Sequence, residues 1–282
     1  MLYIPDSYIE SLINEDLQLM DLTTLALGIE NSPGRLTCFP KRACVLAGVD
    51  EAVRIFTKLG AKTEASVPEG KFVKAGQVFL TAVGTAGMLH AGWKIAQNVI
   101  EYSSGIATRT AEMVKNAQAV KPDIRVAVTR KHFPGTKVLS LKAALAGGAF
   151  IHRVGLSDSV LVFEQHRVFT GTKENFIALI PTMARKLPEK KTVVEADSLQ
   201  DALAFARAGI DVVQCERFDL KELADFVSIA KKINPSLKIS AAGGINASNA
   251  AEYAGTGIDI LVTSWVYFGK PEDVKMRITA EA

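Results

Sequence analysis

A regular alternation of short apolar runs with helical stretches, from about residue 120 onwards, most constrains what this chain can fold into. Apolar residues with helical spacing separate the runs, for example over 198–208 and 220–233. Strand, helix and strand in succession are typical of a parallel sheet, and runs that are apolar throughout indicate strands covered on both faces. The predicted strands span residues 124–128, 148–151, 160–163, 192–196, 211–215, 238–242 and 260–264.

Together these seven strand–helix units predict a closed α/β barrel, with an open, doubly wound sheet as the structural alternative. The first hundred residues instead mix helices and strands, so they predict an α+β domain. One of its helices is rich in small residues, which allow another backbone to approach closely. The expected elements are helices over 7–19, 50–59 and 89–115, a strand over 36–40 and a glycine-punctuated hairpin over 66–84.

Composition and charge exclude several classes of protein. Of 282 residues, 48% are hydrophobic and 22% charged, so a globally disordered chain is excluded. With 33 basic and 30 acidic side chains, the net charge of +3 is too small to indicate a nucleic-acid or membrane-surface protein. No apolar stretch approaches the roughly 18 residues of a membrane span, and signal-peptide features are absent. Three sparse cysteines fit a reducing compartment, so a soluble cytoplasmic protein is expected.

Basic residues follow the first three predicted strands. In parallel α/β sheets the carboxyl ends of the strands meet at one edge, and ligands bind there. Because arginine forks pair with carboxylate or phosphate, a basic cluster at this edge predicts an acidic ligand. The cluster consists of Arg130, Lys131, His132, His152, Arg153, His166 and Arg167.

Acidic residues and then glycine-rich loops follow the remaining strands. Glu195 and Glu216 suit a magnesium ion, which accepts one or two carboxylates together with substrate phosphates. The last two loops, the first of them expected to open a helix, resemble a phosphate cradle of backbone N–H groups. The cradle residues are Gly243, Gly244, Ile245, Thr263 and Ser264. The site is therefore predicted to hold a phosphorylated, metal-bound donor beside a second anionic ligand.

Each of these signals also has a purely structural interpretation. Arg130-Lys131 is consistent with a solvated loop, Glu195 with a structural ion pair, and Gly243-Gly244 with an ordinary turn. His152-Arg153 favours a function more strongly, because a charge buried without a partner is costly. The order of the groups around one sheet edge is what favours a site. Cys215 is expected to pack in the core, and no covalent nucleophile is predicted.

Four motifs, spread over nearly the whole chain, resemble a known family. They are Glu15-Asp16 with Asp21-Leu22-Thr23-Thr24, Gln97-Asn98 with Ser104-Gly105-Ile106-Ala107-Thr108, Thr129-Arg130-Lys131 with Pro134-Gly135, and Gly147-Gly148 with His152-Arg153 and Gly155-Leu156. In this order they resemble the segments ED…GDxTT, N…SGIAT, TRKTxPG and GGGxNHRxGL of the quinolinate phosphoribosyltransferases, the type II phosphoribosyltransferase family. Met20 stands where that family has a glycine.

A second set of residues resembles one branch of the family, the ModD branch, which is named after molybdenum-transport operons. The set comprises Trp93-Lys94, Phe163 with His166-Arg167, Ala242-Gly243-Gly244-Ile245-Asn246, and Leu261-Val262-Thr263-Ser264 with Lys270-Pro271. The resemblance implies a type II phosphoribosyltransferase fold, in which an N-terminal mixed α+β domain packs on an incomplete α/β barrel of about seven strands. The implied domains are 1–112, joined by the tail 268–282, and 113–267. It also implies a homodimer in which each subunit completes its partner's site.

The same resemblance implies roles for individual residues. Those that would bind the acceptor's carboxylates and the pyrophosphate side of the donor, phosphoribosyl pyrophosphate (PRPP), are Arg130, Lys131, His152 and Arg153. Glu195 and Glu216 stand where acidic residues bind the metal and the ribose hydroxyls. Lys94 stands where the family has an arginine donated across the dimer, and Lys137 where it has another arginine. The residues matching the 5′-phosphate loops are Gly243, Gly244, Ile245, Thr263 and Ser264.

Departures from the family pattern concern residues that would carry the chemistry. Val128 replaces an aspartate, Phe163 a lysine, and Glu164-Gln165 and Glu216-Arg217 replace Asp-Asn pairs. Phe163 and His166 are expected to line the acceptor's binding site, but an apolar ring cannot replace charge-assisted hydrogen bonds of roughly 1.5–3 kcal/mol each. The two arginine-to-lysine changes replace planar forks with point charges. The donor half therefore looks retained and the acceptor half altered.

The sequence thus predicts a magnesium-dependent phosphoribosyltransferase. A nitrogen of a small acidic heteroaromatic acceptor would attack C1 of PRPP, and pyrophosphate would leave. Two alternatives stay open: a true quinolinate phosphoribosyltransferase of NAD biosynthesis, and a non-catalytic anion-binding protein in molybdenum handling. Glu195 and Glu216 disfavour the second, because an anion binder gains little from carboxylates. No nucleic-acid or membrane partner is expected.

Overall fold

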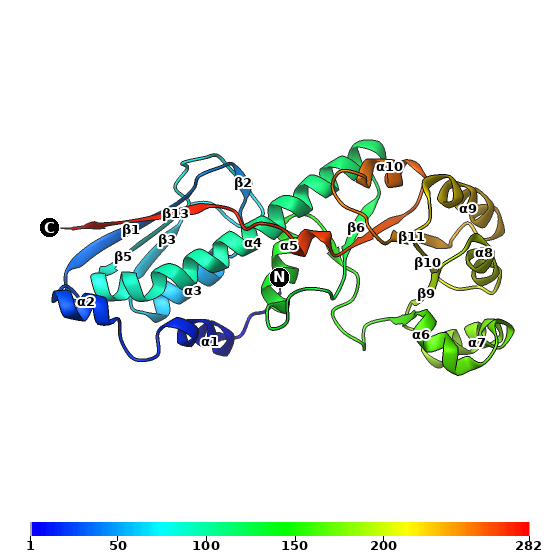
Figure 1. The fold of residues 1–282 in the computed structure, drawn as a ribbon, viewed down its shortest axis with the longest axis horizontal. Coiled ribbons are helices and arrows are strands. Elements are labelled where there is room, and N and C mark those ends of the chain that lie inside the picture. Colours follow the sequence, from blue (N-terminus) through cyan, green and yellow to red (C-terminus); the bar gives the residue numbers. More distant parts are fainter. Residues whose placement is uncertain (1, 282) are drawn as a thin grey trace. The chain divides into compact units, whose positions relative to one another are not determined.

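A computed structural model describes residues 2–281 and divides the chain into two compact units (Figure 1). The first comprises the chain up to Ala111, residues 133–148 and the C-terminal segment from Tyr267. The second comprises residues 112–132 and 149–266. Each unit is thus assembled from segments that are distant in the sequence. No helix of the described residues is long and apolar enough to cross a membrane.

The first unit is built on a four-stranded antiparallel sheet with the order β13-β1-β5-β3. Its C-terminal strand lies beside the first strand of the chain, with Ala280 paired to Gly34 and Val274 to Pro40 (Figure 1). A separate pair, β2 (Cys44–Val45) and β4 (Phe72–Val73), is also antiparallel. The sheet strands are β1 (Pro33–Pro40), β3 (Lys62–Ala65), β5 (Leu80–Thr85) and β13 (Val274–Ala280).

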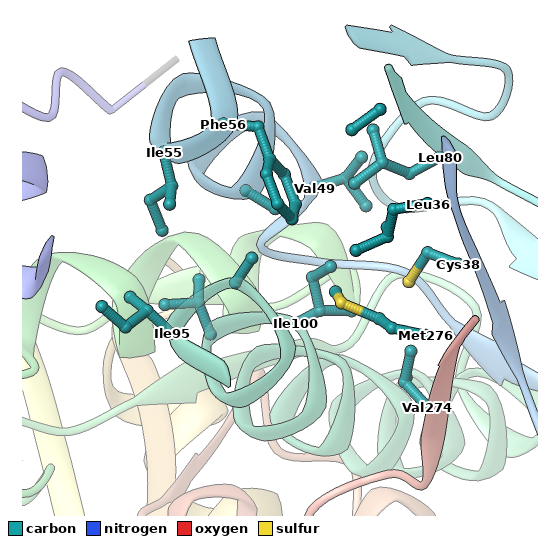
Figure 2. Packing of buried hydrophobic residues seen from close by; sticks show 14 of the residues in the cluster. Leu36, Cys38, Val49, Ile55, Phe56, Leu80, Ile95, Ile100, Val274 and Met276 are labelled. Atoms are coloured by element: carbon teal, nitrogen blue, oxygen red, sulfur yellow. The ribbon is translucent and has the colours of Figure 1, made fainter. Parts of the chain in front are cut away.

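Helices pack on this sheet through a continuous apolar core. Leu36 and Leu80 from the sheet meet Phe56 and Ile100 from the helices, and Met276 joins them from the C-terminal strand (Figure 2). The helices are α1 (Asp6–Asp16), α2 (Leu22–Leu27), α3 (Val49–Lys58), α4 (Ala86–Val120) and α5 (Lys137–Ala146). Of these, α4 belongs to the first unit as far as Ala111.

Small residues on α4 are approached closely by other segments of the same unit. A Cβ atom added at Gly92 would lie 2.8 Å from the Phe56 ring, and one added at Gly105 would lie 3.0 Å from the Lys270 carbonyl oxygen. The hydroxyl of Ser104, buried on the same helix, accepts a hydrogen bond from the backbone N–H of Ala47. The predicted close packing of this helix is therefore satisfied within the chain itself.

The second unit contains a seven-stranded sheet in which every neighbouring pair is parallel, in the order β7-β6-β12-β11-β10-β9-β8. The strands are β6 (Arg125–Val128), β7 (Phe150–Ile151), β8 (Val160–Val162), β9 (Thr192–Ala196), β10 (Val212–Glu216), β11 (Lys238–Ala242) and β12 (Ile260–Thr263). Because β7 and β8 end the order unpaired with each other in the described residues, the barrel is incomplete. The closed barrel expected from the rhythm alone is corrected, whereas the incomplete barrel implied by the family is confirmed.

Helices follow the strands, as the βα pattern predicts. Polar side chains begin three of them by accepting a hydrogen bond from the first turn: Thr172 for α7, Ser198 for α8 and Asp219 for α9. The helices are α6 (Glu164–Arg167), α7 (Lys173–Lys186), α8 (Leu199–Arg207), α9 (Leu220–Ile233) and α10 (Ala250–Gly255). One face of the sheet packs Ala127, Ala242 and Val262 together, and these residues come from three neighbouring strands.

The hairpin predicted over residues 66–84 is wrong. Its first run becomes β4, which pairs with β2, whereas its second run becomes β5, which pairs with β1 and β3. Gly70 and Gly76 do make turns, since both have positive φ angles. The turn signals were correct, but the pairing partners lie elsewhere in the sequence, and a local pattern does not reveal them.

Candidate active site

Predicted site residues gather at the carboxyl ends of the strands of the second unit. The basic residues come first in the strand order: His152 and Arg153 follow β7, and Arg130 and Lys131 follow β6. The loop residues come next, with Thr263 and Ser264 at the end of β12 and Gly243 to Ile245 after β11. Glu216 lies at the end of β10, Glu195 lies in β9, and Phe163 and His166 follow β8. All strands are parallel, so these residues share one edge. Lys94, on α4, and Lys137, on α5, belong to the first unit.

Arg153 is the most unusual cation of this edge. It is only 7% exposed, and no carboxylate of the described part of the second unit lies within ion-pair distance of it. Burial, followed by repulsion from Arg130, lowers its pKa. Burial and then the charge of Arg153 lower the pKa of His152 as well. The charge of Asp158 opposes the shift of the Arg153 pKa, but no ion pair with Arg153 forms among the described residues of the unit. A buried cation without a paired carboxylate, beside an imidazole whose pKa is lowered, is suited to bind an anion.

Phe163 forms a flat surface opposite this cation. Its ring stacks on that of His166, with centroids 5.8 Å apart, and its backbone N–H donates to His166 Nδ1 at 3.0 Å. The Arg153 guanidinium lies 5.9 Å from the centre of the Phe163 ring. Since Arg153 follows β7 and Phe163 follows β8, the two outermost strands of the sheet approach each other at the site.

Glu195 and Glu216 form the acidic part of the edge. Burial, and then the charge of Glu216, raise the pKa of Glu195 above its ordinary value, so the two carboxylates repel each other. Glu195 Oε2 accepts a hydrogen bond from Gln214 Nε2 at 2.9 Å. Among residues 2–281, no group of three or more His, Cys, Asp or Glu side chains is placed to hold a metal. Two carboxylates alone fit a magnesium ion that takes its other ligands from phosphates and water.

Gly243 is required by the shape of the acidic part. It has a φ of 93°, and a Cβ atom there would lie 2.7 Å from Glu216 Oε1 and 2.5 Å from Arg217 Cγ. Arg217, mostly exposed, itself has a φ of 57°, which is strained for a residue with a side chain. Its Nε lies 3.5 Å from Glu216 Oε1. No local sequence pattern predicts this strain.

The expected helix after Gly243 and Gly244 is wrong, because a turn intervenes and α10 begins only at Ala250. In that turn the side-chain amides of Asn246 and Asn249 each donate to the Gly244 carbonyl oxygen at 3.2 Å. Asparagine side chains thus provide the local hydrogen bonds that a helix would have made. Any phosphate cradle here is therefore a loop rather than a helix end.

Thr263 connects the two glycine-rich and hydroxyl-rich loops. Its hydroxyl donates to the Ile245 carbonyl oxygen at 2.8 Å and accepts from the Trp265 backbone N–H at 3.0 Å. Because Thr263 is buried and used in both bonds, its side chain holds the loops in place. Ser264, the next residue, is half-buried.

Of the two predicted site lysines of the first unit, Lys94 contacts other residues of its own helix. Lys94 Nζ lies 4.2 Å from the centre of the Trp93 ring and donates to Gln97 Oε1 at 3.3 Å. Lys137 is the first residue of α5. A different lysine of that helix, Lys142, forms ion pairs within the unit: its Nζ lies 2.7 Å from Oε1 of the buried Glu51 and 2.8 Å from Glu69 Oε2.

Family models match almost the whole described chain. The N-terminal domain model of quinolinate phosphoribosyl transferase matches residues 21–104, and the C-terminal domain model matches residues 106–277. The chain belongs to the quinolinate phosphoribosyl transferase family. This confirms the resemblance, and with it the class of enzyme, a phosphoribosyltransferase.

Relatives of two kinds are found within this family. The "Putative pyrophosphorylase ModD" of Pasteurella multocida is 39% identical over 278 residues, which are 99% of each chain. The nicotinate-nucleotide pyrophosphorylase (carboxylating) of Rattus norvegicus is 30% identical over 272 residues, covering 96% of this chain and 90% of the relative. The solved structure of NadC from Streptococcus pyogenes, at 24% identity, covers 100% of both chains with a TM-score of 0.90, which confirms the fold.

Gln214 and Arg217 are the site residues that sequence reasoning missed. Gln214 lies within a strand, whereas the site prediction rests mainly on residues that follow strands. Its polarity inside an otherwise apolar run was the signal that could have found it. Arg167, which pairs with Asp197 at 3.1 Å, was predicted only as a member of the basic cluster.

Proposed function

We propose that this quinolinate phosphoribosyl transferase family member transfers phosphoribose from PRPP, with magnesium, to a nitrogen of a small acidic heteroaromatic acceptor. Pyrophosphate is the leaving group. The supporting observation is the separation of charge along one strand edge. Glu195 and Glu216 repel each other at one part, whereas the buried Arg153 at another forms no ion pair with a described carboxylate of its unit. A metal-bound donor satisfies the first part and an anionic acceptor the second.

Magnesium fits the acidic part because Glu195 and Glu216 offer hard oxygen ligands and leave most positions to phosphates and water. When bound, the ion would neutralise charge that develops on the leaving pyrophosphate. The carboxylates would bind the ribose hydroxyls on the same side. Gly243 permits this arrangement, since its missing side chain leaves room for Glu216. The loops held together by Thr263 would take the 5′-phosphate, with Gly243, Gly244, Ile245 and Ser264.

The cations would then orient the reactants. Arg130, Lys131 and Arg153 stabilise the pyrophosphate and the acceptor's carboxylate, and neutral His152 offers a hydrogen bond without adding charge. The transition state resembles an oxocarbenium ion, so catalysis consists mainly of positioning and neutralisation. No protein nucleophile takes part; burial raises the pKa of the Cys215 thiol and keeps it unreactive.

The acceptor differs from quinolinate in our proposal. Phe163 presents a ring, stacked on His166, where the family resemblance implies a lysine. A ring stacks on a heteroaromatic acceptor but forms no ion pair with a second carboxylate. Fewer anionic groups on the acceptor are therefore expected. Lys94 and Lys137 would complete the acceptor's surroundings in a cytoplasmic homodimer, with Lys94 contributed by the partner subunit.

Pyrophosphate release tests this function. Protein, PRPP and magnesium are incubated with quinolinate or with a panel of acidic heterocycles, and release is expected with a panel member rather than with quinolinate. Efficient release with quinolinate would instead support an enzyme of NAD biosynthesis. If no acceptor leads to pyrophosphate release and calorimetry detects no PRPP binding, the result would support a non-catalytic anion-binding protein.

Glu195→Ala tests the donor site. The variant is expected to weaken magnesium-dependent PRPP binding at least about tenfold, since it removes a charged partner of the donor. Glu189→Ala is the matched control, because Glu189 is an exposed carboxylate of the same unit. Unchanged binding by Glu195→Ala would remove Glu195 from the donor site.

A further inference from the structure

Gln214 is a buried amide that none of the roles above uses. It is 4% exposed and lies on β10, in register with Glu195 on β9 and with Ser240 on β11. Register partners of a sheet point to the same face, and so does Glu216, two residues further along β10. Gln214 therefore stands beside both carboxylates of the donor site.

The orientation of this amide is determined by its partner. An ionised carboxylate only accepts hydrogen bonds, so the group that faces Glu195 Oε2 at 2.9 Å must be the donor Nε2. Oε1 is then the amide atom that does not face Glu195. It is buried and has no hydrogen-bond partner among the described residues.

An unpartnered oxygen at this place is costly for the folded protein. Buried polar atoms are almost always hydrogen-bonded, and an apolar side chain of similar size would avoid the penalty. Neighbouring residues on the same face include the small apolar Ala242 and Val262, and the hydroxyl of Ser240 donates to the Val213 carbonyl oxygen instead. The amide next to two site carboxylates thus indicates a partner that arrives with a ligand.

We propose that Gln214 binds the ribose of the donor: its Nε2 positions the Glu195 carboxylate, and its Oε1 accepts a hydrogen bond from the ribose 2-hydroxyl. The inference rests on the proposed function, which places the ribose at Glu195 and Glu216. A vicinal diol offers two O–H donors on neighbouring carbons. Glu195 and Gln214, joined by their own hydrogen bond, offer two acceptors side by side.

The arrangement predicts discrimination between ribose and deoxyribose. A sugar that lacks the 2-hydroxyl leaves one of the paired acceptors without its bond, and a site built to hydrogen-bond a hydroxyl rejects the analogue that lacks it. Ribose 5-phosphate and 2-deoxyribose 5-phosphate are therefore suitable probes, because they differ at this hydroxyl alone.

Calorimetry on the full-length protein with magnesium compares the two probes for the wild type, Gln214→Met and Ser240→Ala. The wild type is expected to prefer ribose 5-phosphate about tenfold or more, and Gln214→Met to reduce that preference to about twofold. Its melting temperature should stay the same or rise, because the variant removes an unsatisfied polar atom. Ser240→Ala, buried on the same face, should keep the wild-type preference.

Each other outcome overturns the inference. An unchanged preference in Gln214→Met, or equal weakening of both probes with a lower melting temperature, would show a structural role only. Gln214→Leu repeats the measurement with a differently shaped side chain if the first variant does not fold. A change confined to the acceptor's KM would place the missing partner on the acceptor. A wild type that does not bind PRPP at all would instead contradict the proposed function.

Discussion

The loops after β9 to β12 and those after β6 to β8 hold their charged groups in different ways. In the first set Glu195 is hydrogen-bonded to Gln214, Gly243 makes room for Glu216, and Thr263 connects two loops. In the second set Arg153 is buried without a carboxylate partner in the described part of its unit. Under the proposed function, the donor half is thus arranged by the chain itself, whereas the acceptor half would take its charge balance from a ligand. An enzyme built in this way can change its acceptor without changing its donor.

Arg153→Met should give the largest effect, and most of it should fall on the acceptor half, because the pyrophosphate of the donor keeps Arg130 and Lys131. Loss of a buried arginine that would make two charge-assisted hydrogen bonds to the acceptor should lower kcat/KM for the acceptor about 100-fold to 1000-fold. PRPP binding, measured by calorimetry, should weaken far less. The melting temperature should not fall, because an unpaired buried charge is removed. Arg185→Met, at an exposed arginine of the same unit, is the control. Equal losses for donor and acceptor would contradict the division into halves.

Gly243→Ala should damage the donor half. The new Cβ atom would lie 2.7 Å from Glu216 Oε1, so the carboxylate must move, and PRPP binding should weaken about tenfold to 100-fold. Gly209→Ala is the matched control: its φ of 85° is also positive, nothing lies within 4 Å of the added atom, and it belongs to the same unit but not to the site. Both variants should lose about 1 kcal/mol of unfolding free energy through backbone strain. Similar PRPP affinities in the two variants would show that the fit around Glu216 is unimportant.

Phe163→Lys should alter only the choice of acceptor and leave donor binding unchanged. A restored cation is expected to raise kcat/KM for quinolinate about tenfold, through one charge-assisted hydrogen bond. PRPP affinity should stay within about twofold of the wild type. Phe169→Lys places the same charge at a residue that is 89% exposed, and it should have no effect. If kcat/KM for quinolinate does not rise in the variant, Phe163 does not determine the acceptor.

His152→Gln should show the smallest effect, in stability. Burial lowers the pKa of His152 from 6.5, so below that pH the unfolded chain binds a proton that the folded chain resists. Wild-type stability is therefore complete above pH 6.5 and falls as the pH is lowered, whereas the variant lacks this dependence. Denaturant unfolding from pH 8 to pH 5 should show an extra wild-type loss on the order of 1 kcal/mol. Parallel curves for the two proteins would contradict the burial of His152.

Local patterns in the sequence were sufficient for the barrel strands. The predicted bounds of β9 and β11 match the structure, because each is a short apolar run between clear helix and turn signals. Placing the site needed only the rule that parallel strands end at one edge. The pairing of β4 with β2 could not be predicted in the same way, since neither strand indicates its distant partner.

Details of the site depended on geometry that a one-dimensional pattern does not contain. Arg217 has a left-handed backbone, and its Cγ lies so close to Gly243 that a Cβ atom there would come within 2.5 Å. The turn after Gly244 is made by hydrogen bonds from Asn246 and Asn249. The Gly-Gly pair, taken as the start of a helix, does not predict these bonds. Gln214 sits in mid-strand, where its free oxygen is visible only once its neighbours are placed.

The pairing of β13 with β1 has a consequence for how the protein is made. A ribosome delivers β1 among the first segments and β13 as the last, yet the two strands pair along seven residues. The parallel sheet of the second unit has all of its strands before that point, since β12 ends at Thr263. The domain whose synthesis begins first can therefore complete its sheet only after the barrel has been translated. Until then the edge of β1 is an unpaired strand edge in a nascent chain, exposed to aggregation.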